Sequence, residues 1–245
     1  MSAGTPALAT RGLVVGHGDR RILEVDDLEL PLGAWWAVLG PNGCGKTTLL
    51  DTIAGRKAAL SGSVFIDGHS MTAAPRRARS ALGVVLPPDV LPPRLTLREC
   101  LAVFCAAHGR SKPAADVEEL VGAWGLAGRL DEFVDRSSLG TRQKLAVLLA
   151  LVSDPKLLVL DESFNGLDPA SGIVLKNHLD QRVRGARCSV LLATHALDIV
   201  EQHADCALLI DRGRVRARLG RRELEACRGR LDVRLAERLS TVSAP

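Results

Sequence analysis

The sequence predicts an α/β protein with a mostly parallel sheet. Short, nearly continuous apolar runs recur along the chain, and a stretch of helical pattern follows each one. These runs are Trp36–Leu39, Leu82–Leu86, Leu157–Leu160, Val190–Ala193 and Ala207–Ile210. Such runs are typical of parallel strands with helices on both faces. With 47% hydrophobic and 24% charged residues, the 245-residue chain is expected to form one domain that carries a smaller subdomain.

Two segments depart from this alternation. The first pairs Leu8–Val15 with Ile22–Leu30 across the turn-forming residues 16–19, which predicts an N-terminal antiparallel flap beside the sheet. The second, from about 95 to 140, predicts an inserted helical subdomain that opens with the capping box Thr96–Glu99. Pro113 is expected in the first turn of a second helix there, and Gly125 at its end.

Several function classes are disfavoured by the residues themselves. The longest apolar run, Leu145–Val152, is much shorter than the roughly 20 residues that cross a bilayer. The N-terminus lacks a secretory signal, so a cytoplasmic location is expected. The six cysteines include no CxxC pair, which predicts reduced, buried thiols rather than a zinc site.

The positive charge is concentrated at the C-terminus. From Arg212 to Pro245 there are ten arginines and four acidic residues, and residues 225–245 form the predicted basic tail. A basic segment can bind nucleic acid or anionic lipid. No aromatic residue accompanies this charge to stack on bases, so we expect a solvated face and no nucleic-acid partner.

A phosphate-binding loop lies between the Trp36–Leu39 run and the next helical stretch. It fits G-x-x-x-x-G-K-[ST] and comprises Gly40, Pro41, Asn42, Gly43, Cys44, Gly45, Lys46, Thr47 and Thr48. Glycines let the backbone N–H groups converge on phosphate oxygens at a helix N-terminus. Lys46 is predicted to reach the β- and γ-phosphates and Thr47 to coordinate Mg²⁺. The loop predicts a P-loop NTPase core and a nucleoside triphosphate site.

Two carboxylates, Asp161 and Glu162, follow the Leu157–Leu160 run directly. They would lie at the carboxyl edge of the sheet, where α/β proteins bind ligands. Asp161 is predicted to hold Mg²⁺ through water. Glu162 is predicted to be the general base for water attacking the γ-phosphate. Since a strand that ends in two acids is common by chance, this assignment depends on the phosphate-binding loop.

Residues 137–144, Ser-Ser-Leu-Gly-Thr-Arg-Gln-Lys, resemble the signature motif of ABC ATPases in its S-x-G-x-x-Q form. Apolar residues then recur at helical spacing, so Ser138 and Gly140 are expected at the N-terminus of an amphipathic helix, whose positive end suits a phosphate. The resemblance implies that this phosphate belongs to ATP on the opposite protomer. Ser137 alone is interpreted as an ordinary N-cap.

Further elements extend the resemblance over Leu8–Leu224. Asn165–Asp168 resembles the family's D-loop, which lies across the dimer interface and brings Asp168 to the nucleotide. His195, just after Val190–Ala193, resembles the switch histidine, a catalytic group beside the γ-phosphate. His17 stands where the family usually has a tyrosine that stacks on adenine, and an imidazole stacks less strongly.

The resemblance implies a single ABC ATPase domain over residues 1–245 that uses ATP and Mg²⁺. It implies a homo- or heterodimer that drives transport through a separate transmembrane permease, at the inner face of the membrane. The signature and N-G-L-D loop resemble those of bacterial ABC-2 exporters. A non-transport ABC ATPase acting on ribosomes or nucleic acid is the main alternative. It usually has two ATPase domains or a long coiled coil, and a small-molecule kinase would lack the signature.

One position departs from the family pattern. Where Leu82–Leu86 ends, the family normally has a glutamine that contacts Mg²⁺, whereas this chain has Pro87. No glutamine occurs between Lys46 and Gln143, and proline offers neither a side-chain ligand nor a backbone N–H. Either Asp89 or water is expected to take that place.

Overall fold

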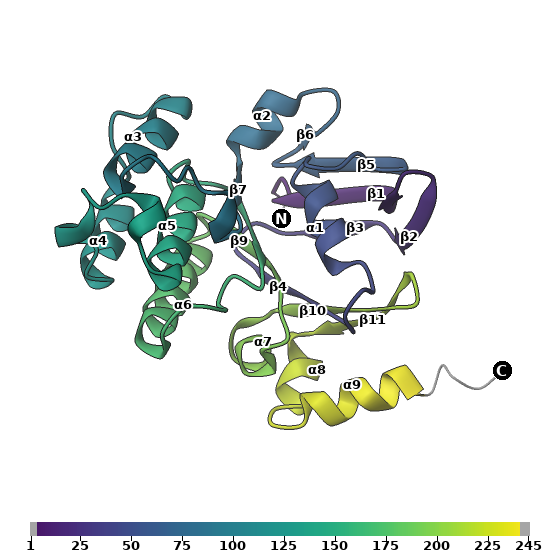
Figure 1. Cartoon of the computed structure of the whole chain (residues 1–245). Coiled ribbons are helices and arrows are strands. Elements are labelled where there is room, and N and C mark those ends of the chain that lie inside the picture. The colour runs from purple at the N-terminus through teal and green to yellow at the C-terminus, as the bar shows by residue number, and fades with distance from the viewer. Residues whose placement is uncertain (1–3, 241–245) are drawn as a thin grey trace.

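A mixed sheet runs through residues 4–240, the part of the chain that the computed structural model describes (Figure 1). Its strands are β1 (Leu8–His17), β2 (Arg20–Val25), β3 (Leu28–Leu30), β4 (Trp35–Leu39), β5 (Ser61–Ile66), β6 (His69–Ser70), β7 (Leu82–Val84), β8 (Leu157–Asp161), β9 (Ser189–Ala193), β10 (Cys206–Asp211) and β11 (Arg214–Gly220). They are ordered β6-β5-β1-β2-β11-β10-β4-β9-β8-β7, with β3 paired to β1.

The five apolar runs of the sequence form the parallel part of this sheet, β10-β4-β9-β8-β7, which confirms the predicted α/β core. β7 ends at Val84, earlier than predicted, and Pro88–Val90 forms a 3₁₀ turn soon after it. Proline has no N–H with which to extend the ladder, so the strand is short.

The N-terminal strands are antiparallel, as predicted. β1 pairs with β2, β3 and β5, and it extends to His17 so that only Gly18 and Asp19 remain in the turn. This antiparallel segment lies beside the parallel strands, as predicted, and the pairing of β2 with β11 connects it to them. Strands β5, β6 and β11 were not predicted from the sequence.

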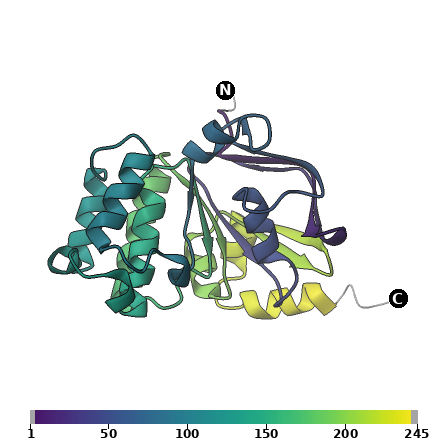
Figure 2. The same cartoon turned by 45° about the horizontal axis from the view of Figure 1, so that its top comes forward.

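Helices cover both faces of the sheet: α1 (Lys46–Ile53), α2 (Pro75–Ser80), α3 (Leu97–Ala107), α4 (Ala115–Ala123), α5 (Leu139–Leu151), α6 (Pro169–Arg184), α7 (Leu197–His203), α8 (Arg221–Ala226) and α9 (Leu231–Ser240). In Figure 2, helices α3–α6 are grouped at one side of the sheet, and α1 lies against the remainder of the sheet. Further 3₁₀ turns lie at Ala127–Arg129 and Val134–Arg136. No helix within residues 4–240 is long and apolar enough to cross a membrane.

The helix boundaries in the subdomain agree with the sequence at two of three points. Thr96 caps α3 in a reciprocal capping box with Glu99. Gly125 follows the end of α4 with a left-handed φ of 65°. The expectation for Pro113 was wrong, since α4 begins at Ala115 and Ala114 is its N-cap.

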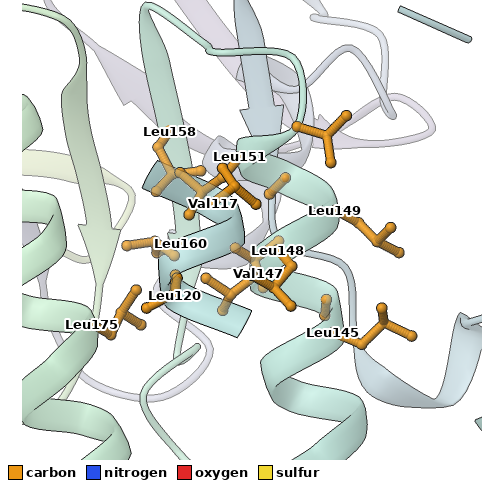
Figure 3. Close-up of a cluster of buried hydrophobic side chains, with 14 of the residues drawn as sticks. Val117, Leu120, Leu145, Val147, Leu148, Leu149, Leu151, Leu158, Leu160 and Leu175 are labelled. Atoms are coloured by element: carbon orange, nitrogen blue, oxygen red, sulfur yellow. The ribbon is translucent and has the colours of Figure 1, made fainter. Parts of the chain in front are cut away.

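Helix α5 is the centre of the larger hydrophobic core. Figure 3 shows its side chains packed against β8, α4 and α6. All eight residues from Leu145 to Val152 are buried, so the predicted one-sided amphipathic helix was wrong for this part of α5. The local pattern indicated one apolar stripe, but neighbouring helices and the sheet surround this helix.

The basic C-terminal segment packs on the sheet as far as Leu235. Leu224 on α8, together with Leu231 and Leu235 on α9, is buried against the sheet residues Ala37 and Leu39. Residues 241–245 of the predicted tail lie outside the described residues. The six cysteines are unpaired, and five of them are buried.

A buried ionic cluster ties the helical subdomain to α6. Arg182 of α6 is 2% exposed, and its Nη2 lies 2.8 Å from Asp116 Oδ2 on α4. Its Nη1 lies 3.1 Å from Asp154 Oδ1, and Arg187 contacts the same two carboxylates. Burial raises the pKa of Asp116, but the two guanidinium groups outweigh this effect and lower it overall. Burial and then Arg182 lower the pKa of His178 in this cluster to about 4.

The lowered pKa of His178 predicts that the fold loses stability in acid. Because the unfolded chain protonates this imidazole near its ordinary pKa of 6.5, stability is lost as the pH falls from about 6.5 towards 4. His178→Gln keeps an acceptor for Arg182 but does not titrate. In urea unfolding at pH 7 and pH 5, the variant should lose about 1 to 2 kcal/mol less than the unaltered chain. Equal losses would contradict this assignment.

Candidate functional site

The carboxyl ends of β4, β8 and β9 meet the start of α1 around a cavity of about 430 Å³. Nine residues singled out from the sequence line it: His17, Asn42, Gly43, Gly45, Lys46, Thr47, Thr48, Asp161 and Glu162, with His195 as a tenth. Segments separated by more than a hundred residues in the chain therefore converge on one site.

The loop before α1 has a backbone that only glycine fits at two points. A Cβ on Gly40 would lie 2.2 Å from the carbonyl oxygen of Ile210. Gly45 has a φ of 109° and is the N-cap of α1, without a side-chain capping bond. The first N–H groups of the helix therefore remain available to a phosphate.

Lys46 is 8% exposed, and its ammonium group lies within the loop. Nζ donates to the carbonyl oxygen of Gly40 at 2.7 Å and to that of Pro41 at 3.1 Å. It also lies 3.5 Å from His195 Nε2. These contacts place one positive charge where the loop and β9 meet, which suits a polyphosphate.

Glu162 has a left-handed backbone, with a φ of 48° that is uncommon for a non-glycine residue. Its N–H donates to the carbonyl oxygen of Ala193 at 2.9 Å, so the residue is fixed to the end of β9. Its Oε1 lies 3.5 Å from His195 Nε2. Strained backbone of this kind is concentrated at functional sites.

Thr47 and Asp161 offer oxygen ligands that fit Mg²⁺. Both line the first cavity and also a second, of about 480 Å³, that adjoins it. Pro87 lines this second cavity, whereas Asp89 does not. The position expected to carry a glutamine therefore borders the same cavity as Thr47 and Asp161, whereas Asp89 lies outside its lining.

His17 lies at the rim of the first cavity, at the end of β1. Its Nε2 is 3.5 Å from Thr48 Oγ1 and 3.5 Å from Lys57 Nζ. The imidazole is therefore beside α1, next to the phosphate-binding loop.

Other expected site residues lie outside this cavity. Gly40, Pro41 and Cys44 of the phosphate-binding loop do not line it, and neither do the signature residues Ser138 and Gly140. Ser138, rather than Ser137, caps α5 by accepting from the Thr141 N–H at 3.2 Å. A Cβ on Gly140 would lie 3.2 Å from the Gly166 carbonyl oxygen, so signature and D-loop pack together.

Asp168 has an evident structural role. Its carboxylate caps α6 through Ser171 and lies 3.1 Å from Lys144 Nζ. The Ser171 hydrogen bonds, with a smaller effect of Lys144, lower the pKa of Asp168. The cavity instead includes Ile22 and Asn165, whose roles the sequence analysis missed. Asn165 was recognised only as part of the D-loop motif.

Comparison with known proteins agrees with this arrangement. A family model described as ABC transporter matches residues 23–165. The chain belongs to the ABC transporter family. Within it, the relatives identify the chain as an ATP-binding subunit, so the resemblance drawn from the motifs is confirmed.

The relatives of this ABC subunit have diverse names. The ABC transporter ATP-binding protein YdbJ of Bacillus subtilis is 36% identical over 86% of this chain and 68% of its own length. The daunorubicin/doxorubicin resistance ATP-binding protein DrrA of Streptomyces peucetius is 34% identical over 94% and 70%. The aliphatic sulfonates import ATP-binding protein SsuB of Cupriavidus necator is 37% identical over 87% and 69%.

Solved structures confirm the fold. The ATP-binding subunit of an ABC transporter superposes with a TM-score of 0.84 at 28% identity, over 95% of this chain and 99% of that one. A dimeric ATP-binding cassette with ADP and phosphate superposes with a TM-score of 0.77 at 19% identity, over 87% and 98%.

The place of Pro87 predicts an altered response to Mg²⁺. Pro87→Gln would add a carboxamide oxygen facing Thr47 and Asp161, so it should lower the Mg²⁺ concentration for half-maximal ATP turnover and raise a slow basal rate. Titration of Mg²⁺ during turnover measures both. Pro92→Gln, in the same loop but outside the cavity, is the control. Unchanged metal response and rate in Pro87→Gln would show that the missing glutamine does not limit this enzyme.

Proposed function

We propose that this subunit hydrolyses ATP to drive transport through a separate transmembrane permease, working as a dimer. The observation that carries the proposal is the single cavity formed by the phosphate-binding loop, the Asp161–Glu162 pair and His195. A phosphate site, oxygen ligands for a metal and a group that positions or deprotonates water are the parts that phosphoryl transfer to water uses, and His195 adds a polar group beside them.

Each group has a distinct part in the proposed reaction. Lys46 and the N–H groups of the loop and α1 hold the phosphates, and His17 stacks on the adenine. Thr47 and Asp161 hold Mg²⁺, which when bound neutralises charge on the β- and γ-phosphates. Glu162 takes a proton from water as the water oxygen bonds to the γ-phosphorus and the bond to ADP breaks. His195 stabilises the γ-phosphate.

The signature supports a head-to-tail dimer. Ser138 and Gly140 lie at the N-terminus of α5 but do not line the cavity of their own chain. In the proposed dimer, these residues complete the site of the partner, which can be a second copy or a homologous chain. The D-loop, including Asp168, packs beside them and extends the same surface.

Export through a permease is the proposed direction, on the form of the signature and of the N-G-L-D loop. The relatives are named both for export and for import and do not favour either. The permease would hold this subunit at the inner face of the membrane. Copurification with a polytopic membrane protein encoded beside it would test the pairing.

Action on nucleic acid is not favoured. Two arginines of the C-terminal segment have partners within the fold, since Arg218 lies over the ring of Trp36 and Arg221 pairs with Glu225. The relatives are named as transporter subunits.

Separate losses of binding and hydrolysis test the proposed roles. Lys46→Ala should weaken ATP binding, because it removes the charge that neutralises phosphate. Glu162→Gln should bind ATP normally and lose turnover, because a carboxamide does not accept the proton from water. Equilibrium binding of a fluorescent ATP analogue and phosphate release measure the two effects. A Glu162→Gln rate within about tenfold of the unaltered rate would contradict the base assignment, since a positioned base contributes roughly 10² to 10⁴.

Mixed dimers test whether Ser138 acts on the partner's nucleotide. When Ser138→Arg chains are combined with Lys46→Ala chains, action across the interface leaves one site with both lesions and one site intact. The mixture should therefore hydrolyse ATP faster than either variant alone. A rate no higher than that of the two separate variants would count against action across the interface. Unchanged circular dichroism of Ser138→Arg controls for loss of the α5 cap.

A further inference from the structure

The residues after β8 fold back on Glu162 through a tight turn. The N–H of Asn165 donates to the carbonyl oxygen of Glu162 at 2.9 Å. The Asn165 side chain contacts the same residue, since its Nδ2 donates to Glu162 Oε2 at 3.2 Å. We propose that Asn165 is a positioning residue that holds the Glu162 carboxylate for attack by water. This inference rests on the proposed role of Glu162 as the base.

The two oxygens of Glu162 differ in their surroundings. Oε1 is buried and accepts no hydrogen bond, and it faces His195 Nε2 at 3.5 Å. The side chain as a whole is 30% exposed, so water can approach the carboxylate at Oε2 rather than at Oε1. Oε2 is also the oxygen that Asn165 contacts. A carboxylate oxygen accepts more than one hydrogen bond, so this contact directs the remaining acceptor position without blocking it.

The turn that carries Asn165 is itself fixed. The buried side chain of Gln143, on α5, donates from Nε2 to the carbonyl oxygen of Ser163 at 2.8 Å. Ser163 Oγ donates to the carbonyl oxygen of Asp161 at 3.3 Å. Ser163 therefore holds the start of this turn to both α5 and the end of β8, which makes the turn a suitable support for a residue that orients a catalytic group.

Asn165 lies where the two cavities meet, since it lines both of them. The residue is exposed in the protomer, so packing does not require an asparagine here. Its polar side chain instead donates a hydrogen bond to Glu162. Substitution should therefore change catalysis with little effect on folding.

Three variants show whether Asn165 acts as a hydrogen-bond donor to Glu162 or only as a residue that suits the turn. Asparagine and aspartate both suit turns, but aspartate has no N–H₂ group and would repel Glu162. We expect kcat to fall about tenfold in Asn165→Ala, further in Asn165→Asp and least in Asn165→Gln, since small misplacements of reacting groups can cost up to about 10² in rate. KM and the Kd of the ATP analogue should stay unchanged. Full activity in Asn165→Asp would overturn the proposal.

A double-variant comparison shows whether Asn165 acts through Glu162. In the Glu162→Gln background, Asn165→Ala should cause no further loss of turnover, and a further loss of about tenfold would overturn the proposal. ATP-dependent dimer formation of this double variant, followed by size-exclusion chromatography, should match that of Glu162→Gln alone. Loss of the dimer would assign Asn165 to the interface instead.

The same set of variants separates the two hypotheses. If Glu162→Gln retains turnover, the proposed base is wrong. If Glu162→Gln is inactive while Asn165→Ala has a normal kcat, the base assignment holds and the positioning role of Asn165 is wrong.

Discussion

The register of the three central strands is the constraint on which the site depends. β9 lies between β4 and β8, and Ala193 is paired with Val38 on one side and with Asp161 on the other. The phosphate-binding loop starts shortly after Val38, His195 lies shortly after Ala193, and Glu162 directly follows Asp161. They reach the same edge of the sheet because all three strands are parallel. A slip of one residue would reverse the side chains between the two faces, and burial on both faces opposes it.

Helix α5 connects this edge with the signature. Its apolar part is buried against β8, α4 and α6, while nearer its N-terminus Gln143 contacts Ser163 and Lys144 contacts Asp168 of the D-loop. The signature and Glu162 therefore belong to one packed unit within each chain. In the proposed dimer, the same unit would present Glu162 to one nucleotide and Ser138 to the other. A shift of α5 would then change the geometry of both nucleotide sites.

The sequence predicted groups whose chemistry is local. The glycines and Lys46 of the loop, the acids after an apolar strand and the capping box at Thr96 each need only neighbouring residues, and each was found in the expected place. The parallel strands of the core also followed from the apolar runs, whereas the order of these strands in the sheet did not. These features require little knowledge of distant contacts.

Other features depend on contacts distant in the sequence. β11 does alternate arginine with Val215, Ala217 and Leu219, a half-buried strand pattern that was overlooked, but its pairing with β10 could not be read from that pattern. The all-round burial of α5 results from helices around it. Asn165 could be recognised only as part of a motif. Its contact with Glu162 depends on a turn that begins at Glu162, whose backbone is left-handed. Ser137 and Ser138 are adjacent, and only the backbone shows that Ser138 is the residue that caps α5.

The central claim is that each nucleotide site is built from two chains. A structure of the Glu162→Gln variant with Mg²⁺ and ATP tests it most directly, through the distance from Ser138 Oγ to the γ-phosphate. The account predicts a hydrogen bond, at about 2.7 to 3.2 Å, to an ATP whose phosphates contact Lys46 of the partner subunit. Two ATP molecules each contacted by one chain alone, with Ser138 facing solvent, would contradict it.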